Sequence, residues 1–525
     1  KIINPLQQAT SSRYNLLNRV VASPDPNGNT TTFEYEALQR LIAVTDAAAN
    51  ITRFAYDPNG NRVKLTDAEG RLTKFVYDPL NRLTQVMDAL GGVTDYGYDE
   101  VGNLVRITDA NGHTTSQEFD GLSRMTGAVD PLGHRWQFTY DGVGNRTSAA
   151  DPNGQTIRFV YDALDRLIEK RLPDGGMVSF SYDKVGNRTL AKNAAVTHTY
   201  EYDSLNRLTK VRDSRFSTPL TYAYDPVGNR TSLTDAEGLT TRYQHDEVDR
   251  LIRIEDPFGG QSQYAYDAAG RRMSRRSPNN VVSLYAYDAA NRLTGLETKH
   301  AMTDNQIDRF AYTYDRVGNR LTMTEPSGEH RYAYDALDRL TEAAYPDGVS
   351  EAFTYDPVGN RLGKTDPAGA TTYAYDAANR LLQDDATAYT YDATGNLFRS
   401  TIGAQSRTYR YDAEHRLLVV EEDGQPLATY TYDATGRRIE KQLGAQRTRY
   451  LSDGAQLLTE YSATNALKAR YVSGPGLDEP LLMVRNGVFS YLHQDGLGSV
   501  TAATDARGVL VESYRYRAFG EGTVL

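Results

Sequence analysis

Aromatic side chains recur along the chain in pairs separated by one smaller residue. Phe54 and Tyr56 form such a pair, as do Tyr373 and Tyr375, and the residues between the rings are mostly Thr, Ala, Val or Ser. Residues at i and i+2 share one face of a β-strand, whereas a helix would place them about 200° apart. The pattern therefore predicts an all-β chain in which one face of each strand carries the rings.

The second aromatic of each pair is followed by Asp, and this Tyr-Asp marker recurs at a nearly constant interval. The sequence contains 21 markers, and 13 of the 20 intervals between them share one length, about 21 residues. Four markers are variants, at Tyr14, Tyr35, Phe119 and His245, and only Ser12 and Gln117 replace the first aromatic. A fixed short period indicates one supersecondary unit copied along the chain, rather than several ordinary domains within 525 residues. The other markers are Tyr56, Tyr77, Tyr98, Tyr140, Tyr161, Tyr182, Tyr202, Tyr224, Tyr266, Tyr287, Tyr314, Tyr334, Tyr355, Tyr375, Tyr391, Tyr411 and Tyr432.

Each marker is followed by a turn signal in one of two alternating forms. The leucine form is Asp-x-Leu-x-Arg-Leu, as at Asp162–Leu167, and the glycine form is Asp-x-Val-Gly-Asn-Arg, as at Asp141–Arg146. Asp can bond its own downstream backbone, and Gly and Asn tolerate positive φ. A second turn of the type Asp-x-x-Gly falls midway, as at Asp109–Gly112. We therefore expect two strands of about 6–8 residues per unit and a structural period of two units, or about 42 residues.

Repetition of the unit predicts one long antiparallel sheet, stabilised by tyrosines that stack on tyrosines of neighbouring strands. The interval from Tyr287 to Tyr314 is the longest, so we expect Glu297–Asp308 to form an exposed insertion loop. The interval from Tyr375 to Tyr391 is the shortest, which predicts a contracted turn. The regular repeat stops after Tyr432, so we divide the chain into a repeat array, 1–445, and a C-terminal region, 446–525.

Composition narrows the class of protein further. The 38 Tyr, 14 Phe and 43 Gly are typical of β structure with many turns. A net charge of −10 and a pI of about 5.4 give no basic footprint for nucleic acid. Without Cys there is no disulfide framework and no thiolate zinc site. No apolar run approaches the roughly 18–20 residues that span a bilayer. The chain begins with Lys1, so we expect it to be truncated and an export signal to lie outside it.

Candidate catalytic chemistry is sparse. His493, Asp495 and Ser499 are the only compact trio of suitable residue types, but their Gly-Leu-Gly-Ser setting is not the Gly-x-Ser-x-Gly of a nucleophile elbow. Gly496 and Gly498 are equally weak as a phosphate loop, because no helix is predicted after them. The eight His are scattered and form no His-Glu-x-x-His motif. We therefore expect no catalytic or cofactor-binding residues and no enzymatic activity.

The Asp-rich turns, the tyrosine rows and the Asp/Arg pairs of the repeats could each bind a ligand or serve the fold. The Asp-rich turn Asp57–Asn61 lacks the ligand spacing of an EF-hand, so we expect no metal. The tyrosine rows could bind sugars, but a ring that recurs in every unit is better explained by folding. Asp162 with Arg166, and Asp225 with Arg230, could form anion or glycan sites, yet a repeated turn-spanning hydrogen bond or ion pair explains them better. Leu104 and Leu397 stand where the turns otherwise carry Arg.

The Tyr-Asp-x-x-Gly-Asn/Arg-Leu repeat at this period resembles the RHS/YD-repeat family, which includes bacterial Rhs toxins, the C components of Tc toxin complexes and the teneurin shell. The C-terminal stretches Tyr491–Val500, Thr504–Gly508 and Tyr514–Glu521 resemble the family's core element, which implies that 446–525 is the N-terminal part of the RHS repeat-associated core. The resemblance implies a β-sheet wound into a hollow cocoon around a C-terminal toxin. It also implies an aspartyl autocleavage site of the Asp-Pro-x-Gly-Leu type further on, for which Asp478-Glu-Pro480 is no substitute.

The sequence thus favours a structural encapsulating shell of an Rhs/Tc-type toxin. Expected partners are the protein's own C-terminal toxin cargo and an N-terminal plug, or a Tc B-type partner. The expected location is secreted or at the cell surface. The alternative is a cell-surface adhesin or contact protein that binds glycans or proteins through the repeat exterior. An enzyme ranks third, and a hydrolytic activity abolished by Ser499→Ala would overturn that ranking.

Overall fold

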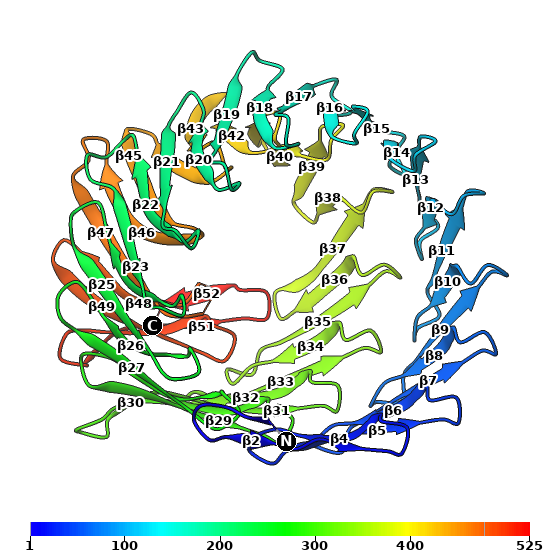
Figure 1. The fold of residues 1–525 in the computed structure, drawn as a ribbon, viewed down its shortest axis with the longest axis horizontal. Coiled ribbons are helices and arrows are strands. Elements are labelled where there is room, and N and C mark those ends of the chain that lie inside the picture. Colours follow the sequence, from blue (N-terminus) through cyan, green and yellow to red (C-terminus); the bar gives the residue numbers. More distant parts are fainter. Residues whose placement is uncertain (1, 477, 525) are drawn as a thin grey trace.

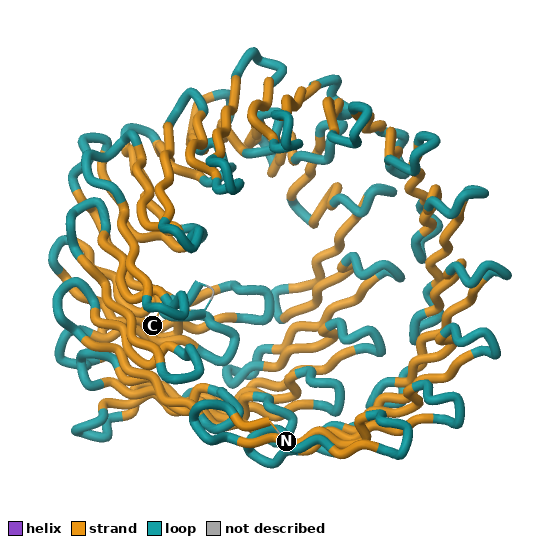
Figure 2. Tube along the Cα trace, in the orientation of Figure 1, coloured by secondary structure: helices purple, strands orange, loops and turns teal. Residues whose placement is uncertain are grey.

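A computed structural model describes residues 2–476 and 478–524, and every regular element in them is a β-strand. Figure 2 shows strands joined by short turns throughout the coil. The predicted all-β class is confirmed. Among the described residues, no helix is long and apolar enough to cross a membrane.

The first part of the chain forms one continuous meander after a separate N-terminal hairpin, β1 and β2. From β3 onward each strand pairs antiparallel with the next strand in sequence. The bounds are β1 (Ile2–Ile3), β2 (Ala9–Thr10), β3 (Arg13–Tyr14), β4 (Val20–Pro24), β5 (Thr30–Tyr35), β6 (Leu41–Thr45), β7 (Ile51–Tyr56), β8 (Arg62–Thr66), β9 (Leu72–Tyr77), β10 (Leu83–Met87), β11 (Val93–Tyr98), β12 (Leu104–Thr108), β13 (Thr114–Phe119), β14 (Met125–Val129), β15 (Arg135–Tyr140), β16 (Arg146–Ala150), β17 (Thr156–Tyr161), β18 (Leu167–Arg171), β19 (Met177–Tyr182), β20 (Arg188–Lys192), β21 (Thr197–Tyr202), β22 (Leu208–Asp213), β23 (Leu220–Tyr224), β24 (Arg230–Thr234), β25 (Thr240–His245), β26 (Leu251–Glu255), β27 (Gln261–Tyr266), β28 (Arg272–Arg276), β29 (Val281–Tyr287) and β30 (Leu293–His300).

The same antiparallel meander continues to the C-terminus without a change of class. The bounds are β31 (Gln306–Tyr314), β32 (Arg320–Glu325), β33 (Gly328–Tyr334), β34 (Leu340–Ala344), β35 (Ser350–Tyr355), β36 (Arg361–Asp366), β37 (Gly369–Tyr375), β38 (Leu381–Asp384), β39 (Thr387–Tyr391), β40 (Leu397–Ile402), β41 (Gln405–Tyr411), β42 (Leu417–Glu422), β43 (Gln425–Tyr432), β44 (Arg438–Leu443), β45 (Gln446–Asp453), β46 (Gln456–Ser462), β47 (Leu467–Ser473), β48 (Pro480–Arg485), β49 (Val488–Gln494), β50 (Val500–Thr504), β51 (Leu510–Tyr516) and β52 (Gly522–Val524).

The turn after each Tyr-Asp marker, here called the marker turn, is built as predicted. In the leucine form, Asp162 Oδ1 accepts hydrogen bonds from the backbone amides of Leu164 (2.9 Å) and Arg166 (3.1 Å). Asp165 has a φ of 59° there, and Gly144 has a φ of 105° at the same point of the glycine form. Asp and Gly are suited to these positions because Gly has no steric penalty at positive φ and Asp tolerates it.

A β-bulge precedes each marker and changes the direction of the marker tyrosine. In the β17–β18 pair the register shifts between Val160 and Tyr161, which re-aims the ring. The tyrosine hydroxyl then donates to a carbonyl of the preceding hairpin, as Tyr182 does to Leu167 O at 2.9 Å. The marker tyrosine therefore joins consecutive hairpins through both its ring and its hydroxyl.

The arginine of the leucine-form turn links one marker turn to the next. Arg166 Nε donates to Asp162 Oδ2 (2.8 Å), its Nη1 donates to Asp183 O (2.8 Å), and its guanidinium lies 5.0 Å from the ring centroid of Tyr182. The predicted turn-spanning ion pair of Asp162 and Arg166 is confirmed.

The glycine-form turn behaves differently, and two expectations fail there. Asp225 Oδ2 accepts from Asn229 Nδ2 (3.1 Å), whereas Arg230 pairs with Asp453 instead of Asp225. Moreover, the arginine that follows such a turn lies between two aromatic rings: Arg146 is 5.4 Å from the centroid of Phe138 and 5.1 Å from that of Phe159. Direct Tyr-on-Tyr stacking is therefore a wrong prediction at these turns, because a guanidinium lies between the two rings.

The sheet winds into a spiral of about two revolutions. In Figure 1 the chain rises on the right through β7–β12, crosses the top, descends on the left, and passes the bottom again at β29–β32 before repeating the path through β33–β37. Many contacts between revolutions join residues about 240 positions apart, such as Asn153 with Asp392 (239) and Asn111 with Asp356 (245). One revolution therefore takes about eleven repeats.

Buried side chains concentrate where revolutions overlap. One cluster combines Leu220, Tyr222 and Leu233 of the first revolution with Leu451 and Tyr461 of the second. By contrast, no hydrophobic side chain between Ala43 and Val178 is fully buried. The core is therefore a seam between revolutions rather than the interior of one unit.

Two irregularities were expected from the marker spacing, and the structure changes one of them. Most of Glu297–Asp308 does not form an exposed loop: β30 and β31 lengthen to 8 and 9 residues and pair through Thr298 and Asp308, both 2% exposed. Only the turn between these strands is exposed, because extending an antiparallel hairpin satisfies backbone groups that a loop would leave unpaired. The short interval after Tyr375 is a contracted hairpin of β38 and β39, as expected.

The sheet also passes residues 445–446 without a break. Leu443 of β44 pairs with Gln446 of β45, and turns on the marker side follow at Asp453, Gly474, Asp495 and Arg517, which continues the marker spacing. The division of the chain at this point stays a prediction.

Candidate functional site

The trio singled out in the sequence is not assembled into a catalytic arrangement. His493 is 1% exposed, and its Nε2 lies 2.8 Å from Thr504 Oγ1. Asp495 Oδ1 accepts the backbone amides of Leu497 (2.8 Å) and Ser499 (2.9 Å), as in the marker turns. Burial and the charge of Arg275 lower the pKa of His493 well below its ordinary value. The imidazole is therefore neutral and bonded to a threonine, without a nucleophile to activate.

The Gly496–Gly498 turn serves as a contact between revolutions. The Gly496 amide donates to Tyr312 Oη at 2.8 Å. A Cβ atom on Gly496 would lie 2.9 Å from both the Tyr312 ring and Leu293. Glycine is thus needed for close approach of two turns of the spiral, and no helix follows among the described residues to bind a phosphate.

The two revolutions meet along a seam, where middle turns of the first revolution contact marker turns of the second. Asn111 Nδ2 donates to Asp356 Oδ2 (2.9 Å), and Asn153 Nδ2 donates to Asp392 Oδ2 (3.1 Å) while its Oδ1 accepts from the Ala393 amide (3.1 Å). A side-chain amide can both donate and accept. Each such Asn therefore fastens one revolution to a carboxylate that already caps its own turn.

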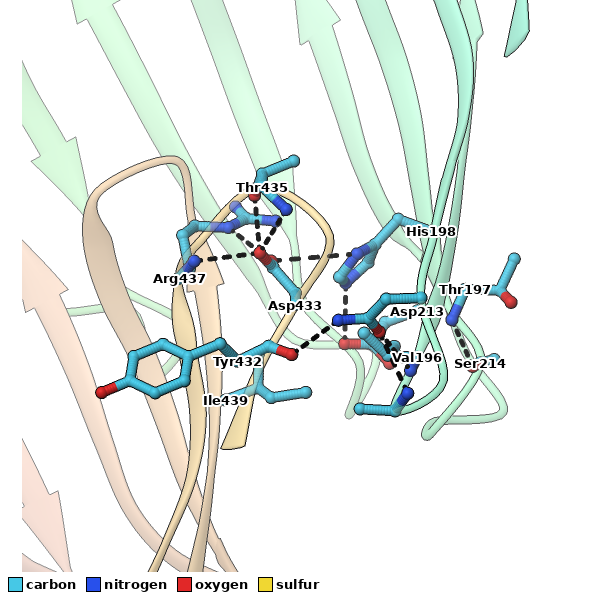
Figure 3. Close-up of polar contacts among 12 residues, drawn as sticks. Val196, Thr197, His198, Asp213, Ser214, Tyr432, Asp433, Thr435, Arg437 and Ile439 are labelled. Atoms are coloured by element: carbon cyan, nitrogen blue, oxygen red, sulfur yellow. Dashed lines mark hydrogen bonds and ion pairs between the residues drawn. The ribbon is translucent and has the colours of Figure 1, made fainter. Parts of the chain in front are cut away.

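A buried charged cluster reinforces the seam at β21–β22 and β43–β44 (Figure 3). His198 Nε2 lies 3.1 Å from Asp213 Oδ2, and its Nδ1 lies 3.9 Å from Asp433 Oδ2. Arg215 pairs with Asp213 at 2.7 Å and donates to Tyr450 O of the second revolution at 2.9 Å. On the second revolution, Arg437 Nε forms an ion pair with Asp433 Oδ2 at 2.8 Å. The cluster joins the revolutions through charge as well as through apolar contact.

Both carboxylates of this cluster are held in their ionised form. Burial opposes ionisation of Asp213, but hydrogen bonds from His198 and Arg215 outweigh it and hold the pKa well below the ordinary value. Burial likewise opposes ionisation of Asp433, whose pKa is lowered by hydrogen bonding to Thr435 and by the charge of Arg437. The arrangement holds charges in fixed pairs and offers no exposed nucleophile.

The C-terminal strands close the spiral more tightly. Ala518 N donates to Tyr345 Oη (2.8 Å) across 173 residues, and Lys364 contacts Glu521 across 157. Phe519 packs edge-on against Phe353 with centroids 4.9 Å apart. These separations are far below those earlier in the seam, so the ring narrows, and Figure 1 shows β51 and β52 within it.

Sequence reasoning did not find the seam residues. His198, Asp213 and Arg215 carry no motif, and they contact the other revolution, where Arg215 bonds Ile439 O and His198 approaches Asp433. The Asn of the middle turns, such as Asn111, was a visible signal, but its role needs the register between revolutions. The turn residues, by contrast, were identified from local spacing.

Metal and sugar sites gain no geometric support. Within residues 2–476 and 478–524, no group of three or more His, Asp or Glu is placed to hold a metal ion. Asp57 directs both carboxylate oxygens to Asn61, at 2.9 Å each, so the turn that invited a calcium interpretation satisfies itself. Many rings are flanked by guanidinium groups, as Phe159 is by Arg146, which leaves less ring surface to a sugar.

The model of the Teneurin YD-shell matches residues 11–193, 184–331 and 319–524. No curated protein matches the chain.

Solved structures of Tc toxins share the fold. The Photorhabdus luminescens Tc holotoxin pore with a mutated TccC3 is similar with a TM-score of 0.81 at 16% identity, over 98% of this chain and 32% of that one. The crystal structure of TcdB2–TccC3 gives 0.68 at 17% identity, over 98% and 33%. The chain thus spans about a third of the length of the structures it matches.

Proposed function

Since the chain belongs to the Teneurin YD-shell family, we propose that it forms part of the wall of an encapsulating shell from an Rhs/Tc-type bacterial toxin. The wall sequesters a toxin polypeptide that is not part of this chain. The observation that carries the proposal is the seam: the sheet returns on itself after about 240 residues and is fastened there by side chains along its edge. A wall that seals against itself can separate an interior from solvent.

Two features of the seam support a wall that encloses a polypeptide rather than an exterior that binds ligands. Its polar contacts at Asn27, Asn111 and Asn153 recur along the edge, and from Val178 onward apolar clusters exclude water between the revolutions. The tightening at Ala518 and Glu521 narrows one end of the coil. A repeat array that only binds ligands on its outer surface would need neither a sealed edge nor a narrowing end.

Protease protection tests the proposal on the full natural polypeptide that carries this chain. We expect a polypeptide within the shell to resist a nonspecific protease under native conditions and to be degraded once urea opens the shell. A seam variant, Arg215→Met with Asp433→Asn, should lose protection. The matched control is Arg171→Met, because Arg171 is exposed and pairs only with Glu169 of its own strand. Equal cleavage of the enclosed polypeptide in native and unfolded shells would contradict the proposal.

The remaining assignments belong to the same proposal. The partners are the toxin cargo with an N-terminal plug, or a Tc B-type chain, and the location is secreted or at the cell surface. We assign no enzymatic role to this chain, because the His493 imidazole is bonded to Thr504 and the Asp495 carboxylate accepts the backbone amides of its own turn. The adhesin alternative is not favoured by any contact described above. A glycan array that shows binding lost on substitution of exposed rings would revive it.

A further inference from the structure

The arginines that follow glycine-form turns form a row on the aromatic face of the sheet. Arg62 lies 5.8 Å from the ring centroid of Phe54 and 5.0 Å from that of Phe75. Arg146 and Arg188 lie between two rings in the same way, at 5.1–5.9 Å. Because the glycine form returns in every second unit, these side chains share one face. We call Arg62, Arg146 and Arg188 the arginine row.

Two later members of the same series show what such a site binds. Arg272 lies between Tyr264 (5.0 Å) and Tyr285 (5.7 Å), and it binds Glu479 through Nη1–Oε1 at 2.6 Å and Nη2–Oε2 at 3.0 Å. Arg230 lies against Tyr243 in the same way and pairs with Asp453. Both carboxylates come from the second revolution, which crosses this face of the sheet.

The geometry explains this preference. Each guanidinium lies within 6 Å of two ring centroids, which favours one position of the side chain, while its planar set of N–H donors stays available for hydrogen bonds. A carboxylate meets those donors with two parallel hydrogen bonds. The site therefore loses little side-chain entropy on binding, because stacking has already ordered the arginine.

The arginine row has the same two-ring geometry without a carboxylate from the chain. Among residues 2–476 and 478–524, no Asp or Glu oxygen lies within ion-pair distance of Arg62, Arg146 or Arg188. Arg188 Nε is buried and has no hydrogen-bond partner among these residues. The equivalent position between Arg62 and Arg146 is Leu104, which interrupts the row.

We propose that the arginine row binds carboxylates of an acidic polypeptide that runs in an extended conformation across the aromatic face. Four inter-strand spacings separate Arg146 in β16 from Arg188 in β20, so the two sites lie about 19 Å apart. An extended peptide covers that distance in about six residues, and linked sites reinforce one another. The inference goes beyond the proposed function, because it names a ligand class and holds whether or not the shell contains a toxin.

The test measures fluorescence anisotropy of a labelled peptide with glutamates about six residues apart, titrated with the full chain. The row variant is R62M/R146M/R188M. The control is R53M/R106M/R158M, which removes three exposed arginines from the opposite face of β7, β12 and β17, none of them ion-paired within the described residues. We expect the row variant to lose affinity by at least about tenfold and the control by less than about threefold.

Two further variants separate the site from general charge and from misfolding. R62K/R146K/R188K keeps the charge but not the planar pair of donors, so we expect affinity to fall with it as well. Leu104→Arg adds a site beside Tyr96 and should raise affinity. Equal losses in the row and control variants, unchanged binding by the lysine variant, or equally tight binding of heparin would overturn the proposal. These outcomes do not depend on protease protection of a cargo, so the two proposals fail separately.

Discussion

Two parts of the same repeat array differ in how they are stabilised. In the thin wall, β7–β17, each unit packs against its sequence neighbours and meets the second revolution through its middle turns, and none of its hydrophobic side chains is fully buried. In the double wall, β19–β31, the second revolution overlaps the first, and equivalent positions are covered: Tyr264 is 5% exposed, whereas Phe54 is only half-buried. The difference shows that each unit specifies a pair of strands by itself, whereas its hydrophobic side chains become fully buried only where another revolution packs against it.

The marker turns show the same contrast at a single position. Two residues after the marker Asp, the first revolution exposes a row of apolar side chains, such as Val143 at 75% and Val185 at 72%. The equivalent Val317 and Val358 of the second revolution are half-buried, since middle turns of the first revolution lie against those turns. The same turn is therefore exposed to solvent in the first revolution and covered by middle turns in the second.

The largest effect is expected in the apolar seam. Leu451→Ala removes a side chain that is 5% exposed and packs with Leu233 and Tyr461. We expect a loss of about 2–5 kcal/mol in the free energy of unfolding, from transfer and cavity terms. The thin-wall control Leu122→Ala, at 71% exposure, should change it by less than about 0.5 kcal/mol. Urea unfolding of both variants measures the difference, and equal losses would show that the revolutions do not support each other.

The charged cluster should give the next largest effect and a pH dependence. The pKa of Asp213 is lower in the folded chain than its ordinary value of about 4. Its ionised form therefore stabilises the fold at pH values above about 4, and this stabilisation is lost as the pH falls further. Asp213→Asn should cost about 2–3 kcal/mol at neutral pH, because His198 and Arg215 lose a charged partner.

Thermal unfolding across the acid range measures this dependence. The difference between the wild-type chain and Asp213→Asn should shrink as the pH falls below about 4. Glu201→Gln serves as the control, since Glu201 pairs with Lys210 at the surface, and it should cost less than about 1 kcal/mol. A gap that stays constant between neutral and acid pH would contradict the assignment of the stabilising charge to Asp213.

A turn position that is covered in one revolution and open in the other gives a smaller contrast. Val358→Lys places a charge where the middle turns of the first revolution lie, and we expect a cost of about 1–2 kcal/mol. Val143→Lys changes the same turn position on the open edge and should cost less than about 0.5 kcal/mol. Calorimetric midpoints measure both, and a larger loss for Val143→Lys would reverse our assignment of the edges.

The smallest expected effect is that of a single seam amide. Asn111→Ala removes the hydrogen bond to Asp356 and should cost about 0.5–1.5 kcal/mol. Asn59→Ala is the matched control, because Asn59 sits at an exposed position of a thin-wall marker turn. The two midpoints are compared by urea unfolding. If both variants unfold at the wild-type midpoint, the middle-turn amides do not fasten the seam.

The repeat pattern predicted the local structure well. The spacing of Phe54 and Tyr56 identified strands, and Asp162 with Arg166 identified the turn and its ion pair. The pattern missed the guanidinium between the rings, because the arginine that follows a glycine-form turn and the rings it contacts lie in different strands. It also assigned Glu297–Asp308 to a loop, since extra length in a hairpin has no signature that separates longer strands from a longer turn.

The sequence by itself thus determined the unit: strand, bulge, turn and the alternation of two turn forms all follow from contacts within neighbouring hairpins. Only the tertiary structure decided which units meet across the seam, such as His198 with Asp433 and Gly496 with Tyr312. The physical reason is that the twist of the sheet accumulates from strand to strand. Each strand pair adds a small twist, and the sum over about 22 strands sets where the sheet returns to itself. No local pattern encodes that sum.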